Sequence, residues 1–434
     1  MSVFGSLGLI LYTYGMNIFF SGIGGVGLGP LAQLAHDAGH TVSGSDAAAS
    51  LTTEALTDQG IPVHIGQNDG YFEQSHQKQP IDLLVYTAAL PPTHPELTKA
   101  HELGVKAVKR DELLAQIIRE KNLKLVAVSG THGKTTTTGM LVWAFKQLGI
   151  PVSYSIGTTI SFGPSGHYDP ASEYFVYECD EFDRNFLHFS PELALVTSLG
   201  YDHSDTYPTK DDYRQAFSRF LKQSAHGIGW RHDLKLLPDV SADTLWQLQD
   251  DEVAPVKLAG EHYRMNATLV LKALEYLGFD YDTSLLESFP GTNRRFEKLA
   301  DNLYSDYGHH PTEIAATLQM ACELSDRVVL VYQPHQNIRQ YEIKGLYRNC
   351  FKDAKKIYWL PTYLSRENPD LAVLTPPELT ADISNKEDIR IADMDDELWT
   401  MLELHRASGD LVLVMGAGSV DGWVRSRLQK QLAD

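Results

Sequence analysis

The sequence predicts an α/β protein of three domains, and three observations support this fold class. Short apolar runs alternate with segments of helical period along most of the chain, which is typical of parallel strands covered by helices. Glycine-rich loops at residues 22–27 and 130–133 each follow such a run and precede a helix. The chain has 434 residues, a length that suits about three domains.

Composition and charge mark an ordinary globular protein and argue against one class of partner. Apolar residues make up 43% of the chain and charged residues 21%, so each domain can bury its own core. The net charge of −19 argues against a nucleic-acid-binding protein, which would need basic surface. An anionic substrate would need local basic groups to hold it against this overall charge.

The three cysteines, Cys179, Cys322 and Cys350, are scattered without metal or disulfide spacing. We therefore interpret them as reduced, buried thiols of a cytoplasmic protein, with a redox role as the alternative. Residues 1–15 are fairly apolar, but they lack the basic region of a signal peptide and are too short to cross a bilayer. We interpret them as an over-extended start and expect no association with a membrane.

The first of these loops, residues 22–27, matches G-x-G-x-x-G between an expected strand over 18–20 and an expected helix over 28–38. We call it the glycine loop. Asp46 ends the next expected strand, 24 residues after Gly22. Glycines that hold a diphosphate, followed by an acid near a ribose, are typical of a Rossmann-like domain. The motif does not say which nucleotide carries the diphosphate, and a turn that only packs the helix on the strand is the alternative.

The alternation of strands and helices continues to the end of this N-terminal domain. A charged stretch over residues 119–124 has the composition of a linker, and we place the first domain boundary near residue 122. Before it, strands are expected over residues 81–86 and 105–108, and helices over 95–103 and 110–118.

The second loop opens the central domain. Residues 125–128 are apolar and mostly β-branched, as in a buried parallel strand, and an apolar helical period follows Thr135. Between them stands G-x-x-G-K-T, which is shorter than the common phosphate-binding form; we call residues 130–134 the phosphate loop. Backbone N–H groups can wrap phosphate oxygens, Lys134 can reach the outer phosphates, and the Thr135 hydroxyl can hold Mg²⁺. We expect a domain like that of P-loop ATPases, with a chance Lys-Thr pair in a turn as the alternative.

Two further expected strands of the central domain, over residues 173–177 and 193–199, are each followed by polar side chains. Ligands of such sheets bind beyond the carboxyl ends of the strands, so Glu178 and His203 can face Lys134. A carboxylate is a natural Mg²⁺ ligand, whereas imidazole is less so because Mg²⁺ prefers oxygen. The alternatives are an ordinary strand-end acid for Glu178 and a supporting or surface position for His203.

A third α/β unit follows a linker at residues 289–293. We expect domains over residues 1–122, 123–290 and 291–434, the last again Rossmann-like. The adjacent His309 and His310 lack cysteine or acid partners at ligand spacing, which disfavours a metal site there. The remaining expected elements are helices over residues 210–223 and 267–277, a poorly patterned stretch over 233–251, strands over 303–307, 328–332 and 411–415, and a helix with Pro311 in its first turn.

Taken together, these ordered motifs resemble the Mur ligase family, whose members use ATP to add amino acids to UDP-muramic acid precursors of peptidoglycan. The resemblance covers roughly residues 16–425. The stretches that carry it are residues 22–27, 43–46, 129–137, 178–183, 202–209, 294–297, 306–314 and 416–418. It implies an ATP-dependent ligase that joins UDP-N-acetylmuramic acid to a small L-amino acid through an acyl phosphate. L-alanine is the expected amino acid. ATP and Mg²⁺ would be its cofactors, and we expect a cytoplasmic monomer or homodimer.

The resemblance also implies roles by position. The catalytic residues would be Lys134, Glu178, His203 and Arg295, and the Mg²⁺ ligands would be Thr135, Glu178 and His203. The UDP substrate would lie on Gly22, Gly24, Gly25 and Gly27, with Asp46 and Thr87 near the uridine. ATP would be held by Gly130, Thr131, His132, Gly133, Lys134, Thr135, Thr136, Asn266, Arg295 and Asp306. The incoming amino acid would lie against Tyr307, His309 and Arg339.

Departures from the family pattern leave alternatives open. Tyr263 stands at the first Asn of G-x-H-N-x-x-N, and Gln336 stands where an Arg usually follows the Pro-His step. The segment over residues 204–261 is short, so the central domain is expected to have lost peripheral strands, and residues 364–367 lack the usual small side chains. A ligase for a tripeptide or another amino acid and a non-catalytic binder of UDP-muramic acid therefore remain alternatives. A dinucleotide-dependent oxidoreductase is suggested by the glycine loop alone, but it leaves Lys134 unexplained.

Overall fold

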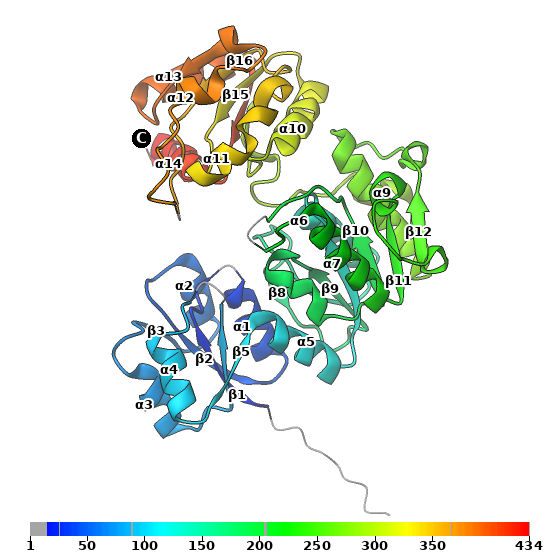
Figure 1. The fold of residues 1–434 in the computed structure, drawn as a ribbon, viewed down its shortest axis with the longest axis vertical. Coiled ribbons are helices and arrows are strands. Elements are labelled where there is room, and N and C mark those ends of the chain that lie inside the picture. Colours follow the sequence, from blue (N-terminus) through cyan, green and yellow to red (C-terminus); the bar gives the residue numbers. More distant parts are fainter. Residues whose placement is uncertain (1–14, 26, 88–89, 204–205, 366, 434) are drawn as a thin grey trace, which may run out of the picture.

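The chain folds into three sheets that follow one another along the sequence (Figure 1). The computed structural model describes residues 15–25, 27–87, 90–203, 206–365 and 367–433. Residues 1–14, nearly all of the stretch interpreted as an over-extended start, lie outside the described residues. The three helix-covered sheets confirm the predicted α/β class.

The N-terminal sheet is parallel and has the strand order β3-β2-β1-β4-β5, as in a Rossmann-like domain. The glycine loop follows β1, which lies between β2 and β4 where the strand order reverses, and such sheets bind ligands at this point. The sequence does not predict α2, β3 or α3, because short segments carry little periodicity. The elements are β1 (Asn17–Ser21), α1 (Leu28–Asp37), β2 (Thr41–Asp46), α2 (Leu51–Asp58), β3 (Val63–Ile65), α3 (Tyr71–Lys78), β4 (Leu83–Tyr86), α4 (Pro95–Glu102), β5 (Lys106–Lys109) and α5 (Arg110–Glu120).

The expected linker over residues 119–124 is wrong in part. α5 continues to Glu120, and the first central strand, β6 (Lys124–Ser129), begins at Lys124. The charged side chains belong to the exposed end of the helix and the exposed start of the strand. The turn between them contains Asn122 with a φ of 53°, a left-handed conformation that Asn adopts more readily than most residues.

The central sheet has the order β12-β11-β10-β6-β9-β7-β8 and is parallel except for the β7–β8 pair. Residues 233–251, expected to be poorly patterned, include β12. β11 and β12 together form one edge of the sheet. The short segment over residues 204–261 therefore still contributes peripheral strands. β7 and β8 are also unpredicted. The elements after β6 are α6 (Lys134–Gln147), β7 (Val152–Ser155), β8 (Gly166–His167), β9 (Tyr174–Glu178), η1 (Phe182–His188), β10 (Leu193–Val196), α7 (Lys210–Gln223), β11 (His226–Trp230), α8 (Arg231–Leu234), η2 (Ala242–Thr244), β12 (Leu245–Leu248), η3 (Asp250–Glu252), α9 (Glu261–Tyr276) and η4 (Thr283–Leu286).

The C-terminal sheet has the order β13-β14-β18-β15-β16-β17, with only the β13–β14 pair antiparallel. Pro311 begins α10 as predicted, and the His310 side chain caps that helix by accepting from the Thr312 N–H. The elements are β13 (Glu297–Ala300), β14 (Leu303–Asp306), α10 (Pro311–Leu324), β15 (Val328–Tyr332), α11 (Asn337–Ile343), η5 (Lys344–Asn349), β16 (Lys356–Trp359), α12 (Pro376–Thr380), η6 (Lys386–Asp388), β17 (Ile389–Ile391), α13 (Asp396–Ala407), β18 (Leu411–Met415) and α14 (Val420–Ala433).

β6 is apolar on both faces because helices cover both. Val126 and Val128 belong to a core cluster with α6 and α9, whereas Leu125 and Ala127 belong to a cluster with α7. The first cluster continues into α10 of the C-terminal domain, and the second continues into α1 and α5 of the N-terminal domain. These continuous cores hold the central domain against both neighbours and so fix the clefts between them.

The expected burial of the three cysteines is wrong in part: Cys179 and Cys350 are buried, whereas Cys322 on α10 is exposed.

None of the helices in the described part of the chain combines the length and the apolar character that crossing a bilayer requires.

Candidate active site between the domains

The glycine loop is held by the end of β2. The N–H groups of Gly22 and Ile23 donate to the Ser45 carbonyl at 2.8 and 2.9 Å, and the Gly24 N–H donates to the Asp46 carboxylate at 2.8 Å. Thr87 lies beside the same loop, since a Cβ atom at Gly22 would stand 3.7 Å from its methyl group. The structure thus brings the predicted Asp46 and Thr87 to the loop, where Asp46 fixes the loop's conformation.

Arg110 lies at the end of the glycine loop and was missed by the sequence reasoning. A Cβ atom at Gly27 would stand only 2.5 Å from a guanidinium nitrogen of Arg110. A cavity of about 130 Å³ joins Gly27 and Arg110 to Lys134 and Glu178 of the central domain. Arg110 is therefore a local cation between the two loops. Its signal in the sequence is a basic residue at the carboxyl end of an expected strand, the position where ligands bind.

The phosphate loop turns on two glycines, Gly130 with a φ of 133° and Gly133 with a φ of 88°, which other residues would strain to adopt. The Lys134 ammonium donates to the Glu181 carboxylate at 2.9 Å. Glu181 is fully buried, and burial raises its pKa while Lys134 works to lower it. Glu181 is a second residue that the sequence reasoning missed. It lies in the stretch over residues 178–183, but the sequence alone indicated no partner for it.

Thr135 and Glu178 form a pair of oxygen donors beside the loop. The Thr135 hydroxyl donates to Glu178 at 2.7 Å, and the Gly157 N–H donates to the other carboxylate oxygen at 2.7 Å. A second group lies nearby: in the described part of the chain, Asp180, Glu181 and His203 each offer a ligand atom, all within 4.8 Å of one another.

The end of β10 bends toward the phosphate loop, so the expected strand over residues 193–199 stops at Val196. The Ser198 hydroxyl accepts from the His132 N–H at 2.9 Å, and the Thr197 hydroxyl donates to the His132 carbonyl at 2.5 Å. The Thr131 hydroxyl shares a hydrogen bond of 2.7 Å with the Tyr213 hydroxyl. The side chain of Thr131 is therefore engaged by the central domain's own α7.

A cavity of about 200 Å³ lies between the central and C-terminal domains. Gly133 and Asn266 meet there, since a Cβ atom at Gly133 would stand 2.8 Å from the Asn266 carboxamide oxygen. Tyr263 and Glu313 line this cavity. The lining also includes most of the predicted ATP-binding residues, namely His132, Gly133, Thr135, Thr136, Asn266, Arg295 and Asp306. Three of the predicted ATP-binding residues, Gly130, Thr131 and Lys134, are not in this lining, and Lys134 lines the neighbouring cavity instead.

Asp306 is buried in this lining and accepts two backbone hydrogen bonds. The N–H groups of Phe296 and Gly308 donate to it at 2.8 and 2.7 Å. Burial nevertheless raises the pKa of Asp306 to about 6. Keeping an ionised carboxylate here costs stability, which is typical of a group retained for binding.

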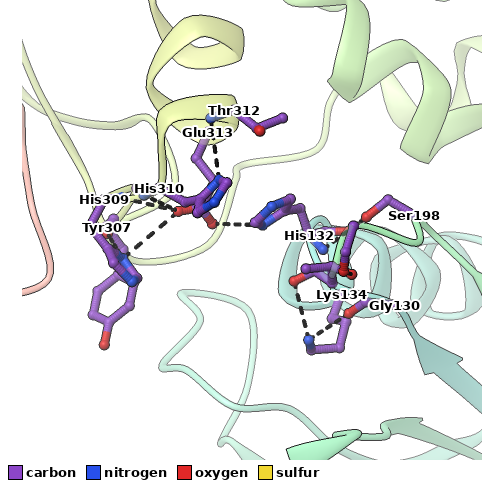
Figure 2. A network of polar contacts seen from close by, with 12 residues as sticks. Gly130, His132, Lys134, Ser198, Tyr307, His309, His310, Thr312 and Glu313 are labelled. Atoms are coloured by element: carbon purple, nitrogen blue, oxygen red, sulfur yellow. Dashed lines mark hydrogen bonds and ion pairs between the residues drawn. The ribbon is translucent and has the colours of Figure 1, made fainter. Parts of the chain in front are cut away.

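Glu313 joins the phosphate loop to the C-terminal domain (Figure 2). One carboxylate oxygen lies 3.3 Å from the His132 imidazole, and the other accepts from the N–H groups of His309 and His310 at 3.0 and 3.1 Å. The Arg295 guanidinium lies 3.8 Å away. Burial would raise the pKa of Glu313, but His132, His309 and Arg295 hold it well below its ordinary value. The sequence reasoning missed Glu313 because the contact that makes it a bridge, with His132, reaches into another domain.

A second contact joins the same two domains. The guanidinium of Arg264 in α9 pairs with Glu323 in α10 at 2.8 Å, and the Gly260 N–H donates to the same carboxylate at 2.9 Å. The pair lowers the pKa of Glu323 to about 2. Two ion pairs, His132–Glu313 and Arg264–Glu323, thus bridge the central and C-terminal domains.

The residues predicted for the amino acid lie together in the C-terminal domain. The Arg339 guanidinium contacts the His309 imidazole, and the rings of Tyr307 and His309 are perpendicular at 5.7 Å between centroids. Burial lowers the pKa of His309 to about 4, so His309 is neutral at pH 7 and Arg339 is the cation of the three. Gln336 has a φ of 59° and donates its N–H to the Tyr363 carbonyl at 2.9 Å.

Fold and site together define a three-domain nucleotide-binding protein, with the phosphate loop in the central domain and the glycine loop in a neighbouring domain. Family models match along most of the chain: the Mur ligase family catalytic domain over residues 17–122, the Mur ligase middle domain over 128–233 and the Mur ligase glutamate ligase domain over 294–418. The protein belongs to the Mur ligase family.

Relatives and solved structures agree with this assignment. The chain is 33% identical to UDP-N-acetylmuramate–L-alanine ligase of Nocardioides sp., covering 93% of each chain, and 31% identical to that of Laribacter hongkongensis, covering 93% of this chain and 95% of the relative. The crystal structure of UDP-N-acetylmuramate-alanine ligase from Thermotoga maritima matches with a TM-score of 0.73 at 23% identity, over 96% of this chain and 99% of that one. A murein peptide ligase from Psychrobacter arcticus matches with a TM-score of 0.62 at 23% identity, over 97% and 99%.

Proposed function

We propose that the protein is an ATP-dependent ligase that joins the lactyl carboxylate of UDP-N-acetylmuramic acid to a small L-amino acid, with L-alanine as the preferred substrate. The reaction would belong to peptidoglycan precursor synthesis in the cytoplasm. One observation carries the proposal. Lys134 of the phosphate loop lines a cavity that reaches Gly27 of the glycine loop and Arg110 at the start of α5. His132 and Gly133 of the phosphate loop line a separate cavity with Arg295 and Asp306. Two anionic substrates can therefore meet at Lys134.

The chemistry follows from this meeting. A carboxylate is a poor acyl donor, so its oxygen first attacks the γ-phosphorus of ATP, the bond to the β-phosphate oxygen breaks, and ADP leaves. The neutral amine of the amino acid then attacks the acyl phosphate, an amide bond forms, and inorganic phosphate and a proton leave. Phosphoryl transfer needs positioning and charge neutralisation more than covalent help. Lys134 and Arg295 supply positive charge on the two sides of the phosphate loop.

The donor set beside the phosphate loop fits Mg²⁺, which prefers oxygen ligands. Thr135 and Glu178, whose oxygens lie 2.7 Å apart, would hold one ion. His203 would serve a second, together with Asp180 or Glu181 from the group within 4.8 Å. When bound, Mg²⁺ neutralises phosphate charge.

In the N-terminal domain we assign the UDP diphosphate to the glycine loop, with Asp46 holding that loop in shape and Thr87 beside it. We also assign Arg110 to this site, as the cation that attracts the negatively charged diphosphate of the substrate. Asn266 and Asp306 are assigned to the adenine and ribose of ATP in the other cavity.

In the C-terminal domain we assign the amino acid to Tyr307, His309 and Arg339. Arg339 is the only one of the three with a charge at pH 7, so it would pair with the α-carboxylate. Gln336 brings a hydrogen bond without charge. For this reason a peptide acceptor, as in the murein peptide ligase that the fold resembles, is the second candidate.

The test is phosphate release from ATP in the presence of UDP-N-acetylmuramic acid and a panel of acceptors: L-alanine, L-serine, glycine and the tripeptide of peptidoglycan. We expect release only with both substrates, fastest with L-alanine, and a product whose mass increases by one alanyl residue. The Lys134→Ala variant serves as the control for contaminating ATPases. Release with the tripeptide alone would assign the second candidate, and binding of UDP-N-acetylmuramic acid without release would leave a non-catalytic binder.

A further inference from the structure

The hinge between the central and C-terminal domains, residues 292–296, carries a strained backbone. Arg294 has a φ of 56° and Phe296 a φ of 47°, and neither is a residue that adopts the left-handed region readily. Arg295 lies between them and lines the cavity of about 200 Å³ between the central and C-terminal domains, which we call the nucleotide cavity. Strained conformations persist only where surrounding contacts hold them, so the contacts of this hinge decide where Arg295 points.

Three of these contacts come from the hinge itself and the C-terminal domain. The Arg295 N–H donates to the Thr292 carbonyl at 3.1 Å. The Arg294 N–H donates to Glu297 and the Phe296 N–H donates to Asp306, both at 2.8 Å. They shape the turn, but they do not relate it to the phosphate loop.

Further contacts come from the central domain, where Thr158 and Thr159 hydrogen-bond Asn293 and where α9 reaches the Arg295 carbonyl. Tyr263 lies in the first turns of α9, and its hydroxyl donates to the Arg295 carbonyl at 2.8 Å. The Tyr263 side chain is only 7% exposed, and Tyr263 lines the same cavity as Thr136 at the start of α6. One phenol of the central domain, which lies in the same cavity lining as His132 and Gly133 of the phosphate loop, thus holds the backbone of the hinge.

We propose that Tyr263 is a positioning residue that holds Arg295 in register with the phosphate loop through the hydrogen bond from its hydroxyl to the Arg295 carbonyl. Because the bond engages the backbone, it does not occupy the guanidinium, which lies 3.8 Å from Glu313 and can meet phosphate charge. The inference rests on the proposed function, in which Arg295 meets the γ-phosphate. It predicts that the hydroxyl serves the reaction, whereas the ring serves as a wall of the nucleotide cavity.

The test is Tyr263→Phe, which removes the hydroxyl and keeps the ring. We expect kcat to fall roughly tenfold, the effect of one lost hydrogen bond, with little change in the KM for ATP. The matched control is Tyr276→Phe, the same change on the same helix, where the ring stacks on His226 at 4.6 Å. That variant should keep the wild-type kcat, and equal melting temperatures would show that both variants fold.

Hydrogen–deuterium exchange of the peptide covering the hinge is the second readout, and it needs no activity. The amides of Arg295 and Phe296 should exchange faster in Tyr263→Phe than in the wild type or in Tyr276→Phe. Unchanged exchange, or a raised KM for ATP with unchanged kcat, would overturn the inference. If the wild type released no phosphate with any acceptor, the proposed function would fail, and faster hinge exchange would still support the positioning of Arg295 by Tyr263.

Discussion

The Lys134 ammonium lies 2.9 Å from the carboxylate of Glu181, which is fully buried, so the cation of the phosphate loop already has a partner before any phosphate arrives. Such a pair is held by mutual attraction in a place where either charge alone would be costly. Phosphate oxygens must compete with Glu181 for Lys134. The residue that defines the loop therefore has a structural as well as a chemical role.

We expect Lys134→Ala to abolish ATP turnover while binding of UDP-N-acetylmuramic acid remains, because the glycine loop belongs to another domain. The variant should also lose about 3–5 kcal/mol of unfolding free energy, since Glu181 is left as a buried unpaired charge. Calorimetry measures the binding, and urea denaturation measures the stability.

The matched control for that variant is the double change Lys134→Ala with Glu181→Gln. It should regain most of the stability, because no buried charge is left unpaired, and it should remain inactive. Loss of UDP-substrate binding together with ATP binding in either variant would show that the two loops do not serve separate sites.

For the metal, we predict that Glu178→Gln and His203→Ala each raise the Mg²⁺ concentration needed for half-maximal phosphate release. Both residues lie beside the phosphate loop, Glu178 on the Thr135 hydroxyl and His203 with its imidazole 3.8 Å from Glu181. Asp211→Asn is the control, since this carboxylate is 82% exposed on α7. A Mg²⁺ titration that matches the wild type would remove the substituted residue from the metal site.

The pH dependence of stability should report on Asp306. Burial raises its pKa from 3.8 to about 6, so the folded protein favours the protonated form. The stability linked to this group is complete below about pH 4 and is lost as the pH rises through 6, an effect on the order of 3 kcal/mol. We expect the unfolding free energy of the wild type to fall by that amount relative to Asp306→Asn between pH 4 and pH 7. Parallel curves for the two proteins, measured by urea unfolding, would show that Asp306 keeps its charge throughout this range.

For the amino acid, Gln336→Arg should lower the KM for L-alanine, and Arg339→Ala should nearly abolish its use. A charge-assisted pair with the α-carboxylate contributes on the order of 1.5–3 kcal/mol, roughly ten- to a hundredfold in affinity. Gln336 already has a positive φ, so replacing it with Arg adds no new backbone strain.

Arg348 is an exposed residue of the same domain. Arg348→Ala is therefore the control for the variants at Gln336 and Arg339, and it should keep the wild-type KM for L-alanine. A wild-type enzyme that ignores L-alanine, L-serine and glycine but turns over the tripeptide would contradict the assignment.

Local pattern was enough to predict much of this fold. The phosphate loop, the strand before it and the helix after it are dictated by neighbours in sequence, and so is the start of α10 at Pro311. Short or edge segments such as β3, β7 and β8 escaped prediction because two to four residues carry too little periodicity to separate from a loop.

The sequence by itself determined which side chains stand at the ends of strands, because glycine turns and apolar runs act over a few residues. Glu178 and Asp46 were found in this way, whereas the role of Asp306 came from the family resemblance. Only the tertiary structure decided which of these groups meet. Glu181 reaches Lys134 across 47 positions, Tyr263 reaches the hinge carrying Arg295 across 32, and Glu313 reaches His132 in another domain. The physical reason is that such contacts depend on how sheets and domains pack, and a residue's immediate neighbours in the chain do not encode that packing.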